Sequence, residues 1–328
     1  MTISAVSTVF LAILSCSIGS VLPTALAQSP ASLQFDADGV QMLLRSAPNA
    51  SHLRLGNTDP NNSRSFGFDY KASAIANLVE FNPVTTAVTS SPGVAEKSPP
   101  AAQKFTYWRL PATALQYASG ASGFTARLHL YASGGQQNFN WKTQKGYLSS
   151  PLDVKNQEFT AYVRVHEVLT PQIAQVTLKI RGGKHSEKEP DAGSCTMMTF
   201  APRSNSGGVA RFGKELSHPQ YDYVKLRPAL DISLSENTWI GLKLLSYTNP
   251  QNPLQTINQM HIDTTPFDAN QRPANQWRLL SEYSDEESKS TGFYNQLVNW
   301  GGWQTTLRMD GYRSIDFAFV SVREILAP

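Results

Sequence analysis

Polar and apolar residues alternate in two neighbouring stretches of the chain, 158–166 and 174–181. A period of two is typical of a β-strand with one face buried and one face open to solvent. Cations, His and Tyr gather on the polar positions, where an ordinary solvated face would carry scattered Ser, Thr and mixed charge. The polar positions are Glu158, Thr160, Tyr162, Arg164 and His166 in the first stretch and Gln175, Thr177, Lys179 and Arg181 in the second. We therefore expect these faces to bind or transform a polar, anionic ligand.

The rest of the chain predicts many more short strands. Apolar runs of strand length are separated by clusters of Gly, Pro, Asn and Ser, and helical periodicity is scarce. Such a pattern is typical of an all-β fold, either a sandwich or a barrel. Segment 82–103, rich in Thr, Ser and Pro, predicts a long surface loop. The further strands are expected at Val40–Leu44, Phe105–Leu110, Phe124–Tyr131, Trp239–Tyr247, Gln255–Thr264, Gln276–Tyr283, Gln304–Met309 and Ile315–Ile325.

The first 27 residues have the character of a secretory signal peptide. Residues 6–26 are mostly apolar or small and carry no charge, and Ala25-Leu26-Ala27 gives the pattern expected before cleavage. We therefore expect a signal peptide at 1–27, a single domain at 28–328 and a secreted, extracellular protein. One alternative makes Cys16 a lipidated surface anchor. Another is an uncleaved membrane anchor, although Pro23 interrupts the apolar stretch.

Composition narrows the function classes. The 328-residue chain has a formal net charge of +3 and no basic run, which argues against a nucleic-acid partner. Hydrophobic residues make up 41% of the chain, enough for a core without disulfide bridges. Cleavage of the signal peptide would leave one of the two cysteines, Cys195, and a single cysteine builds no disulfide framework. Cys195 is expected to be a buried apolar residue rather than a nucleophile.

Several short motifs in a fixed order carry a resemblance to a known superfamily. They are Asp36-Ala37-Asp38-Gly39-Val40, Glu158-Phe159-Thr160-Ala161-Tyr162, Arg181-Gly182-Gly183-Lys184-His185, Arg211-Phe212-Gly213-Lys214-Glu215, Trp300-Gly301-Gly302-Trp303 and Ser321-Val322-Arg323-Glu324-Ile325. In this order they resemble secreted members of the concanavalin A-like jelly-roll superfamily, which includes lectins, glucanases and polysaccharide lyases. The resemblance implies an all-β, antiparallel β-sandwich of jelly-roll type with long loops, and a sugar-binding groove on one sheet.

The chain departs from the catalytic motifs of that superfamily. The laminarinase-type Glu-x-Asp-x-Glu strand is missing, since the nearest candidate, Glu282–Glu286, has Ser284 where Asp is needed. Of the alginate-lyase motifs, only Gln-Ile-His has a near match, at Gln259-Met260-His261. The resemblance therefore transfers no catalytic residue beyond His261 as a candidate.

Lyase chemistry on a uronic acid needs a cation or amide at the carboxylate, a base for the C5 proton and an acid for the leaving oxygen. The two cationic strands would supply these groups together if they were neighbours in one sheet. The candidate catalytic residues are Tyr162, His166, His218, Tyr221 and His261, and the candidate substrate-binding residues are Arg164, Lys179, Arg181, His185, Trp239 and Lys243. A hydrolase would instead need two carboxylates at one cleft, for which Glu158 with Glu215 or Glu282 is the available pairing.

A structural interpretation of the same faces stays open. Arg, Lys, Glu and Tyr are common on solvated strands, where Glu158 would pair with Lys179 or Arg181. Metal ligation is weakly indicated, because the six His are scattered. No cofactor is expected to be required, while Asp36, Asp38 and Asp310 could contribute to a structural Ca²⁺ site.

The sequence thus predicts an extracellular carbohydrate-active protein. The favoured activity, if it is catalytic, is that of a lyase on an acidic, uronate-containing polysaccharide. The alternative is a non-catalytic, lectin-like protein that binds carbohydrate. In both cases the partner is a polysaccharide or oligosaccharide, the protein is a monomer, and neither nucleic acid nor a membrane span is involved.

Overall fold

The computed structural model describes much of the chain, and all but the first of the described residues belong to one compact unit, Gln34–Pro328. The described residues are 33–48, 52–54, 57–58, 66–69, 79–81, 103–116, 122–132, 155–182, 195–204, 207–217, 220–225, 234–286, 297–302 and 304–328. The expected signal peptide at 1–27 and the long loop expected at 82–103 lie almost wholly outside these residues. Cleavage after Ala27 and the bounds of the mature domain therefore stay predictions.

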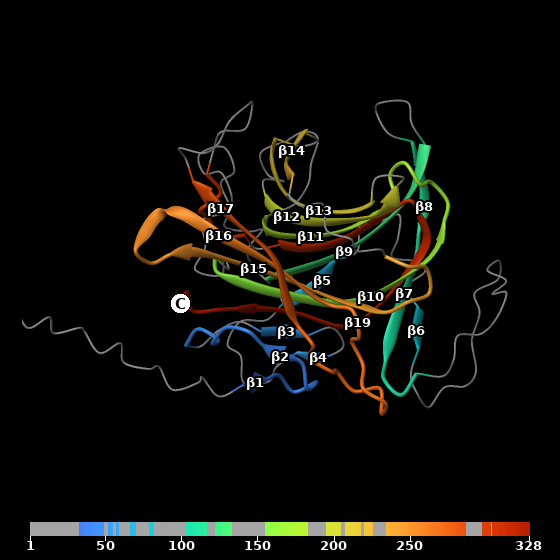
Figure 1. Ribbon diagram of the computed structural model, residues 1–328, viewed down its shortest axis with the longest axis horizontal. Coiled ribbons are helices and arrows are strands. Elements are labelled where there is room, and N and C mark those ends of the chain that lie inside the picture. Colours follow the sequence, from blue (N-terminus) through green and yellow to red (C-terminus); the bar gives the residue numbers. More distant parts are fainter. Residues whose placement is uncertain are drawn as a thin grey trace, which may run out of the picture. The chain divides into compact units, whose positions relative to one another are not determined.

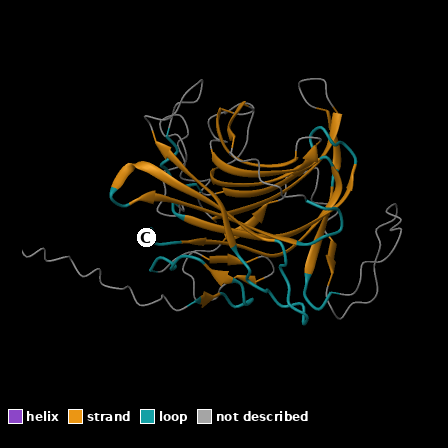
Figure 2. Ribbon diagram, in the orientation of Figure 1, coloured by secondary structure: helices purple, strands orange, loops and turns teal. Residues whose placement is uncertain are grey.

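The described residues form strands and loops, with no helix among them (Figure 2). Two large antiparallel sheets, which we call sheet A and sheet B, lie one over the other (Figure 1). A separate hairpin near the N-terminus consists of β1 (Gln34–Phe35) and β2 (Gln41–Met42). The all-β, antiparallel sandwich predicted from the sequence is confirmed.

Sheet A has nine described strands. Along its main path the order is β17-β16-β15-β10-β19-β3-β4, and β7 pairs with both β19 and β6. Its strands are β3 (His52–Arg54), β4 (Asn57–Thr58), β6 (Val79–Phe81), β7 (Tyr107–Pro111), β10 (Gln157–Val168), β15 (Ile240–Asn249), β16 (Asn252–Asp263), β17 (Arg278–Glu286) and β19 (Tyr312–Glu324).

Sheet B has eight described strands in the order β14-β13-β12-β11-β18-β9-β5, with β8 beside β9. Its strands are β5 (Phe66–Asp69), β8 (Thr113–Gln116), β9 (Ser122–Ala132), β11 (Gln175–Gly182), β12 (Cys195–Ser204), β13 (Gly207–Ser217), β14 (Gln220–Lys225) and β18 (Gln304–Asp310). The chain crosses between the sheets repeatedly, from β9 to β10, from β10 to β11, and from β18 to β19. This crossing gives the sandwich its jelly-roll character.

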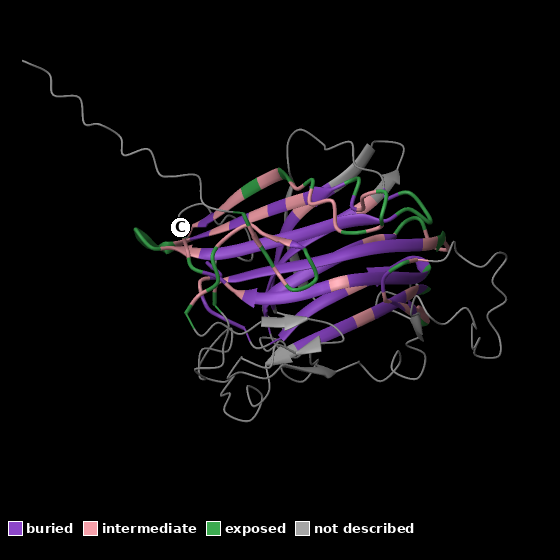
Figure 3. Ribbon diagram, turned by 90° about the horizontal axis from the view of Figure 1, so that it is seen from below, coloured by how far each residue is buried: buried purple, intermediate pink, exposed green. Residues whose placement is uncertain are grey.

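The core lies between the two sheets and follows the alternation of the sequence. Every second residue of a strand points inward, so the apolar positions of both sheets meet in one buried cluster. Most strand residues are buried (Figure 3). The inward residues include Phe159, Ala161, Val163 and Val165 of β10, Val176, Leu178 and Ile180 of β11, Ala126, Leu128 and Leu130 of β9, and Leu307 and Met309 of β18.

Three strand residues have a positive φ, Glu167 near the end of β10 and two others at shifts of the strand register. Arg181 has φ 57° where the register of β11 and β18 shifts, and Phe319 has φ 50° where the register of β10 and β19 shifts. A bulge of this kind inserts an extra residue and redirects the side chains next to it. Both redirected side chains matter for the candidate site.

Glycines at two turns allow a direct test of backbone packing. Gly39 and Gly311 both have positive φ, 79° and 78°, but a Cβ on Gly39 meets no heavy atom within 4 Å, whereas one on Gly311 would lie 2.5 Å from Ala174 Cα. We expect Gly39→Ala to lower the free energy of unfolding by about 1–2 kcal/mol, the cost of the left-handed conformation. Gly311→Ala should cost roughly 2 kcal/mol more, because backbone must move. Chemical denaturation of both variants measures the difference, and equal costs would contradict the packing described for Gly311.

Candidate functional site

The two cationic strands lie in different sheets. β10 belongs to sheet A and β11 to sheet B, so the condition that they be neighbours in one sheet is not met. Because their apolar positions meet in the shared core, their polar positions face opposite outer sides of the sandwich. The period of two identifies the faces of a strand, but it does not say which strands share a sheet. Glu158 and Glu215 are separated in the same way, which removes that carboxylate pair as a hydrolase site.

The polar faces are also not open. Tyr162 and Arg181 are fully buried, Arg164 and Lys179 are nearly so, and so is Lys243 on the neighbouring strand β15, which corrects the expectation of a solvated face. A buried ion is stable only when it is paired and hydrogen-bonded, and these ions are. The exposed fractions are 6% for Arg164, 4% for Lys179 and 1% for Lys243.

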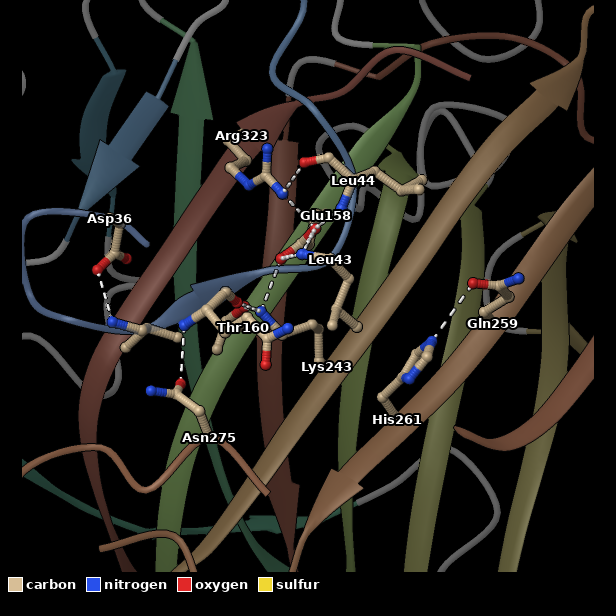
Figure 4. A network of polar contacts seen from close by, with 12 residues as sticks. Asp36, Leu43, Leu44, Glu158, Thr160, Lys243, Gln259, His261, Asn275 and Arg323 are labelled. Atoms are coloured by element: carbon tan, nitrogen blue, oxygen red, sulfur yellow. Dashed lines mark hydrogen bonds and ion pairs between the residues drawn. The ribbon is translucent and has the colours of Figure 1, made fainter. Parts of the chain in front are cut away.

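Glu158 anchors the N-terminal segment to the outer face of sheet A (Figure 4). Its carboxylate accepts hydrogen bonds from the backbone N–H of Leu43, at 3.2 Å, and of Leu44, at 3.4 Å. It also pairs with Lys243, at 2.6 Å, and with Arg323. Burial alone would raise the pKa of Glu158, but the two cations outweigh it and lower the pKa. Glu158 therefore stays ionised at the centre of this network.

Lys243 and Arg323 bind the same segment through its carbonyl groups. Lys243 Nζ donates to Gln41 O, at 2.9 Å, and Arg323 donates to Leu44 O, at 2.6 Å. Lys243 also lies 4.7 Å from the centre of the Trp277 ring, within range of a cation–π contact. We call residues 36–46 the strap, since they cross the outer face of sheet A and are held there by side chains of the sheet.

An aromatic cluster lies beneath and beside the strap. Val40 of the strap is 2% exposed and packs into it. Its aromatic members are Phe105, Tyr107, Tyr162, Trp239, Phe267, Trp277 and Phe319. Phe319 reaches this outer cluster because of its bulge. The predicted candidates Tyr162 and Trp239 are thus packed among rings and are not presented to solvent, and burial raises the pKa of the Tyr162 hydroxyl far above its ordinary range.

A second ion cluster surrounds Asp316 at the other end of this face. Asp316 is fully buried and accepts from Arg109, at 2.6 Å, from Arg164, at 2.6 Å, and from His166 Nε2, at 2.8 Å. The other ring nitrogen of His166 lies 2.6 Å from Asn237 Oδ1. Burial would raise the pKa of Asp316, but the hydrogen bonds from His166 and Arg109 hold it at about 2. Arg164 and His166 therefore share one carboxylate and form an internal ion network.

His261 lies on β16, next to Lys243 on the side toward the β17 edge of sheet A. The two residues are register partners on β16 and β15, and His261 Nε2 lies 3.3 Å from Gln259 Oε1. Gln259 in turn donates to Glu282, at 2.8 Å. Burial first, and then the Lys243 cation, lower the pKa of His261 to about 4, so its imidazole is neutral near pH 7.

Arg181 does not join Lys179 on the outer face of sheet B. The bulge turns its side chain inward, where its guanidinium donates to Ser246 Oγ of sheet A, at 2.8 Å, and to Trp300 O, at 3.1 Å. The backbones are close here, since a Cβ on Gly302 would lie 2.2 Å from Gly182 N. Arg181 thus ties the two sheets together at one end of the core.

The outer face of sheet B joins Thr177 and Lys179 to polar residues of neighbouring strands that the sequence did not single out as site candidates. Direct register partners across five strands form one row, and the next row carries Lys179, Thr306 and His129. The same alternation that marked β10 was present in β9 and β18, at 125–131 and 304–310, and would have identified these faces. The first row consists of Arg211 on β13, Thr199 on β12, Thr177 on β11, Arg308 on β18 and Arg127 on β9.

Charges on this polar face are balanced locally. Lys179 Nζ lies 2.6 Å from Glu215, and Arg308 Nε lies 2.6 Å from Asp310. His129 Nδ1 lies 2.8 Å from the side-chain nitrogen of Gln304, which donates to it and so leaves the ring proton of a neutral His129 on Nε2. In Figure 1 the strands of sheet B bow so that this outer face is the concave one.

The remaining candidates are not tested by these contacts. His185 and His218 lie outside the described residues, and Tyr221 is on β14, where only the backbone is described. Within the described ranges no group of three His, Cys, Asp or Glu side chains is arranged to hold a metal ion. Asp36 accepts the backbone N–H of Asp38 and Val40, both at 2.9 Å.

Cys195 is buried, as expected, and its thiol is free. Burial raises the pKa of this thiol to about 12, so almost none of it is thiolate at neutral pH. In the part of the chain that the structure covers, no helix has the length and apolar character needed to cross a membrane.

Comparisons with known proteins give structural neighbours only. No protein-family model and no curated protein matches the chain. The glucuronan lyase from the fungus Trichoderma reesei is 12% identical, covers 66% of this chain and 81% of its own, and has a TM-score of 0.35. The VIP36 exoplasmic/lumenal domain bound to Ca²⁺ and Man3GlcNAc is 8% identical, with 80% and 85% covered and a TM-score of 0.32.

A xylan β-1,4-xylosidase from Bacillus halodurans is 10% identical over 66% of this chain, with a TM-score of 0.32, and the match spans only 32% of the xylosidase. These neighbours are of the carbohydrate-active kind that the sequence resemblance implied. With TM-scores below 0.5 they carry no argument about the present chain, whose fold class rests on its own strand order and register.

The Asp316 cluster predicts a specific pH dependence of stability. Because the pKa of Asp316 is lowered to about 2, its carboxylate contributes stability in full above the ordinary aspartate pKa and loses it as the pH falls toward 2. The free-energy difference between wild type and Asp316→Asn should therefore shrink by on the order of 2 kcal/mol between pH 5 and pH 2. Denaturant unfolding across this range measures it, with Asp38→Asn as the exposed control. A difference that does not change with pH would contradict the ion network.

Proposed function

We propose that this protein is a secreted, carbohydrate-active protein that binds an acidic polysaccharide on the outer face of sheet B. The observation that carries the proposal is the row of Arg211, Arg308 and Arg127 with Thr177 and Thr199 between them. Strands lie about 4.8 Å apart, so the row spans roughly 19 Å, the length of several sugar units. Guanidinium groups bind carboxylates in a fork. Thr177 and Thr199 are buried and hydrogen-bond each other, so the three half-buried arginines carry the proposed binding.

The proposed reaction is β-elimination at a uronic acid. A base takes the C5 proton, the electron pair forms the C4–C5 double bond, the C4–O bond breaks, and the departing oxygen receives a proton. A cation beside the substrate carboxylate stabilises the developing negative charge. His129, on the same face, is the candidate acid for the departing oxygen; its Nε2 is buried, so it must become accessible before it can donate. Arg127, two residues away on the same face, would neutralise the carboxylate.

A non-catalytic, lectin-like function is the second candidate. It is favoured by the pairing of Lys179 with Glu215 and of Arg308 with Asp310, because these ion pairs neutralise part of the positive charge of this face. Such a face would bind an acidic polysaccharide without concentrating positive charge beside one substrate carboxylate. The two candidates use the same residues and differ only in turnover.

Binding and turnover are tested together on the full mature protein. Alginate, polygalacturonate and glucuronan are compared with neutral laminarin, with Ca²⁺ and with a chelator, by affinity electrophoresis and by the ultraviolet absorbance of the unsaturated product. Arg127→Gln and Arg211→Gln should each weaken binding to the acidic polymer by about five- to tenfold, or roughly 1–1.4 kcal/mol.

Arg313→Gln is the matched control, since Arg313 is exposed and pairs with Glu167 away from this face. Binding with product formation supports the lyase, and binding without product supports the lectin-like alternative. If no acidic polymer binds better than laminarin, or if the control weakens binding as much as the two row variants, the proposed site is wrong.

A further inference from the structure

The strap is attached to the sandwich mainly by side chains. Its residues 36–46 add no strand to sheet A, and beyond the bridge between Ser46 and Ile325 its contacts run through a few polar groups. Glu158, Lys243 and Arg323 hold its central part, while Asn275 accepts from Gln41 N, at 2.7 Å, and donates to Gly39 O, at 2.9 Å. An element held in this way opens at lower free energy than the strands beneath it.

Burial supports the same conclusion. Val40 is the one buried strap residue, and the residues on either side of it are half-buried or exposed. Moving the strap would expose Val40 and the half-buried side chains of Met42, Leu43 and Leu44, and would leave the core between the sheets untouched, since Val40 belongs to the separate aromatic cluster. Opening therefore costs the strap's hydrogen bonds and a small apolar area, and it spares the main core.

The face below the strap has unused hydrogen-bonding capacity. Tyr162 is fully buried and its hydroxyl has no hydrogen-bond partner, and the same holds for the indole N–H of Trp239 and Trp277. Buried donors without partners are rare and call for an explanation. In the open state, Lys243 and Arg323 would also need oxygen acceptors in place of Gln41 O and Leu44 O, while Glu158 would need donors.

We propose that the strap is a separable cover, and that the face it uncovers binds a sugar chain at a site distinct from the face of sheet B. Sugar hydroxyls both donate and accept, so one ligand satisfies Glu158 together with Lys243 and Arg323. Sugar rings also pack against aromatic side chains such as Trp277 and Tyr162. The closed strap imitates such a ligand with its backbone N–H and C=O groups, and the sugar competes with it.

Native-state hydrogen exchange on the full mature protein tests the cover. The amides of Leu43 and Leu44 should exchange through a local opening, at least tenfold faster than the amides of Phe159 and Leu244 in the strands below. Asn275→Gly keeps the positive φ of 57° and removes both amide anchors, so it should raise strap exchange about tenfold further and leave the strands unchanged.

Gln271→Gly is the matched control. Gln271 lies in the same loop with φ 62° and accepts a backbone N–H at 2.7 Å, but the bond comes from Lys104 and not from the strap. If strap and strand amides exchange together, or if the two variants act alike on the strap, the cover does not exist.

Sugar binding is measured separately, on an array of neutral and acidic oligosaccharides. Asn275→Gly should bind at least one oligosaccharide more tightly than wild type and Gln271→Gly, and Lys243→Met should abolish the gain. A gain that persists in Arg127→Gln shows that the uncovered face is responsible and not sheet B. An array on which Asn275→Gly binds no better than wild type overturns the sugar site, whatever the outcome for acidic polymers.

Discussion

The arrangement of this molecule depends on the pairing of charges that have been taken out of water. A buried carboxylate or ammonium group is tolerated only where opposite charge and hydrogen bonds replace its hydration. Glu158 meets this requirement with Lys243 and Arg323 on one side and with backbone amides of the strap on the other. Asp316 meets it with two arginines and a histidine. Each network joins segments far apart in the sequence, so the outer layer is fixed by electrostatics while the inner layer is fixed by apolar packing.

The fold class follows from the sequence because the alternation of apolar and polar residues determines which side of each strand is buried. Residues that alternate apolar and polar can bury one side of a strand, and the apolar positions of β10 and β11 do meet in the core as their pattern requires. The partner of each strand is a different matter. β10 and β11 are consecutive and alike in pattern, yet β10 pairs with β15 and β19, and β11 with β12 and β18. Pairing depends on contacts between distant segments, which a local period does not contain.

The candidate site shows the same limit at the level of single residues. Strict alternation along β11 would place Arg181 on the same face as Lys179. A bulge instead turns the Arg181 side chain into the space between the sheets. The alternation along β9 and β18 correctly indicates the outward positions, which place His129 and Arg308 on the same face as Lys179. The burial of Tyr162 and Trp239 could not be read from their own strands, because it is produced by Val40 and by rings from distant loops. Polar alternation thus located side chains correctly wherever the backbone stayed regular and nothing else packed on the face.

The bulge at Phe319 has a consequence for folding. β19 is the longest of the described strands and pairs with β10, β7 and β3. Slipping a regular strand by one residue would exchange its two faces, carrying the Asp316 carboxylate into the apolar interior. The extra residue divides β19 into two halves of opposite parity, with Phe317 and Val320 both inward. A one-residue slip against β10 would reverse both halves at once, turning Phe317 and Val320 outward and Asp316 into the core, so slips of odd length are strongly disfavoured for the central strand pair.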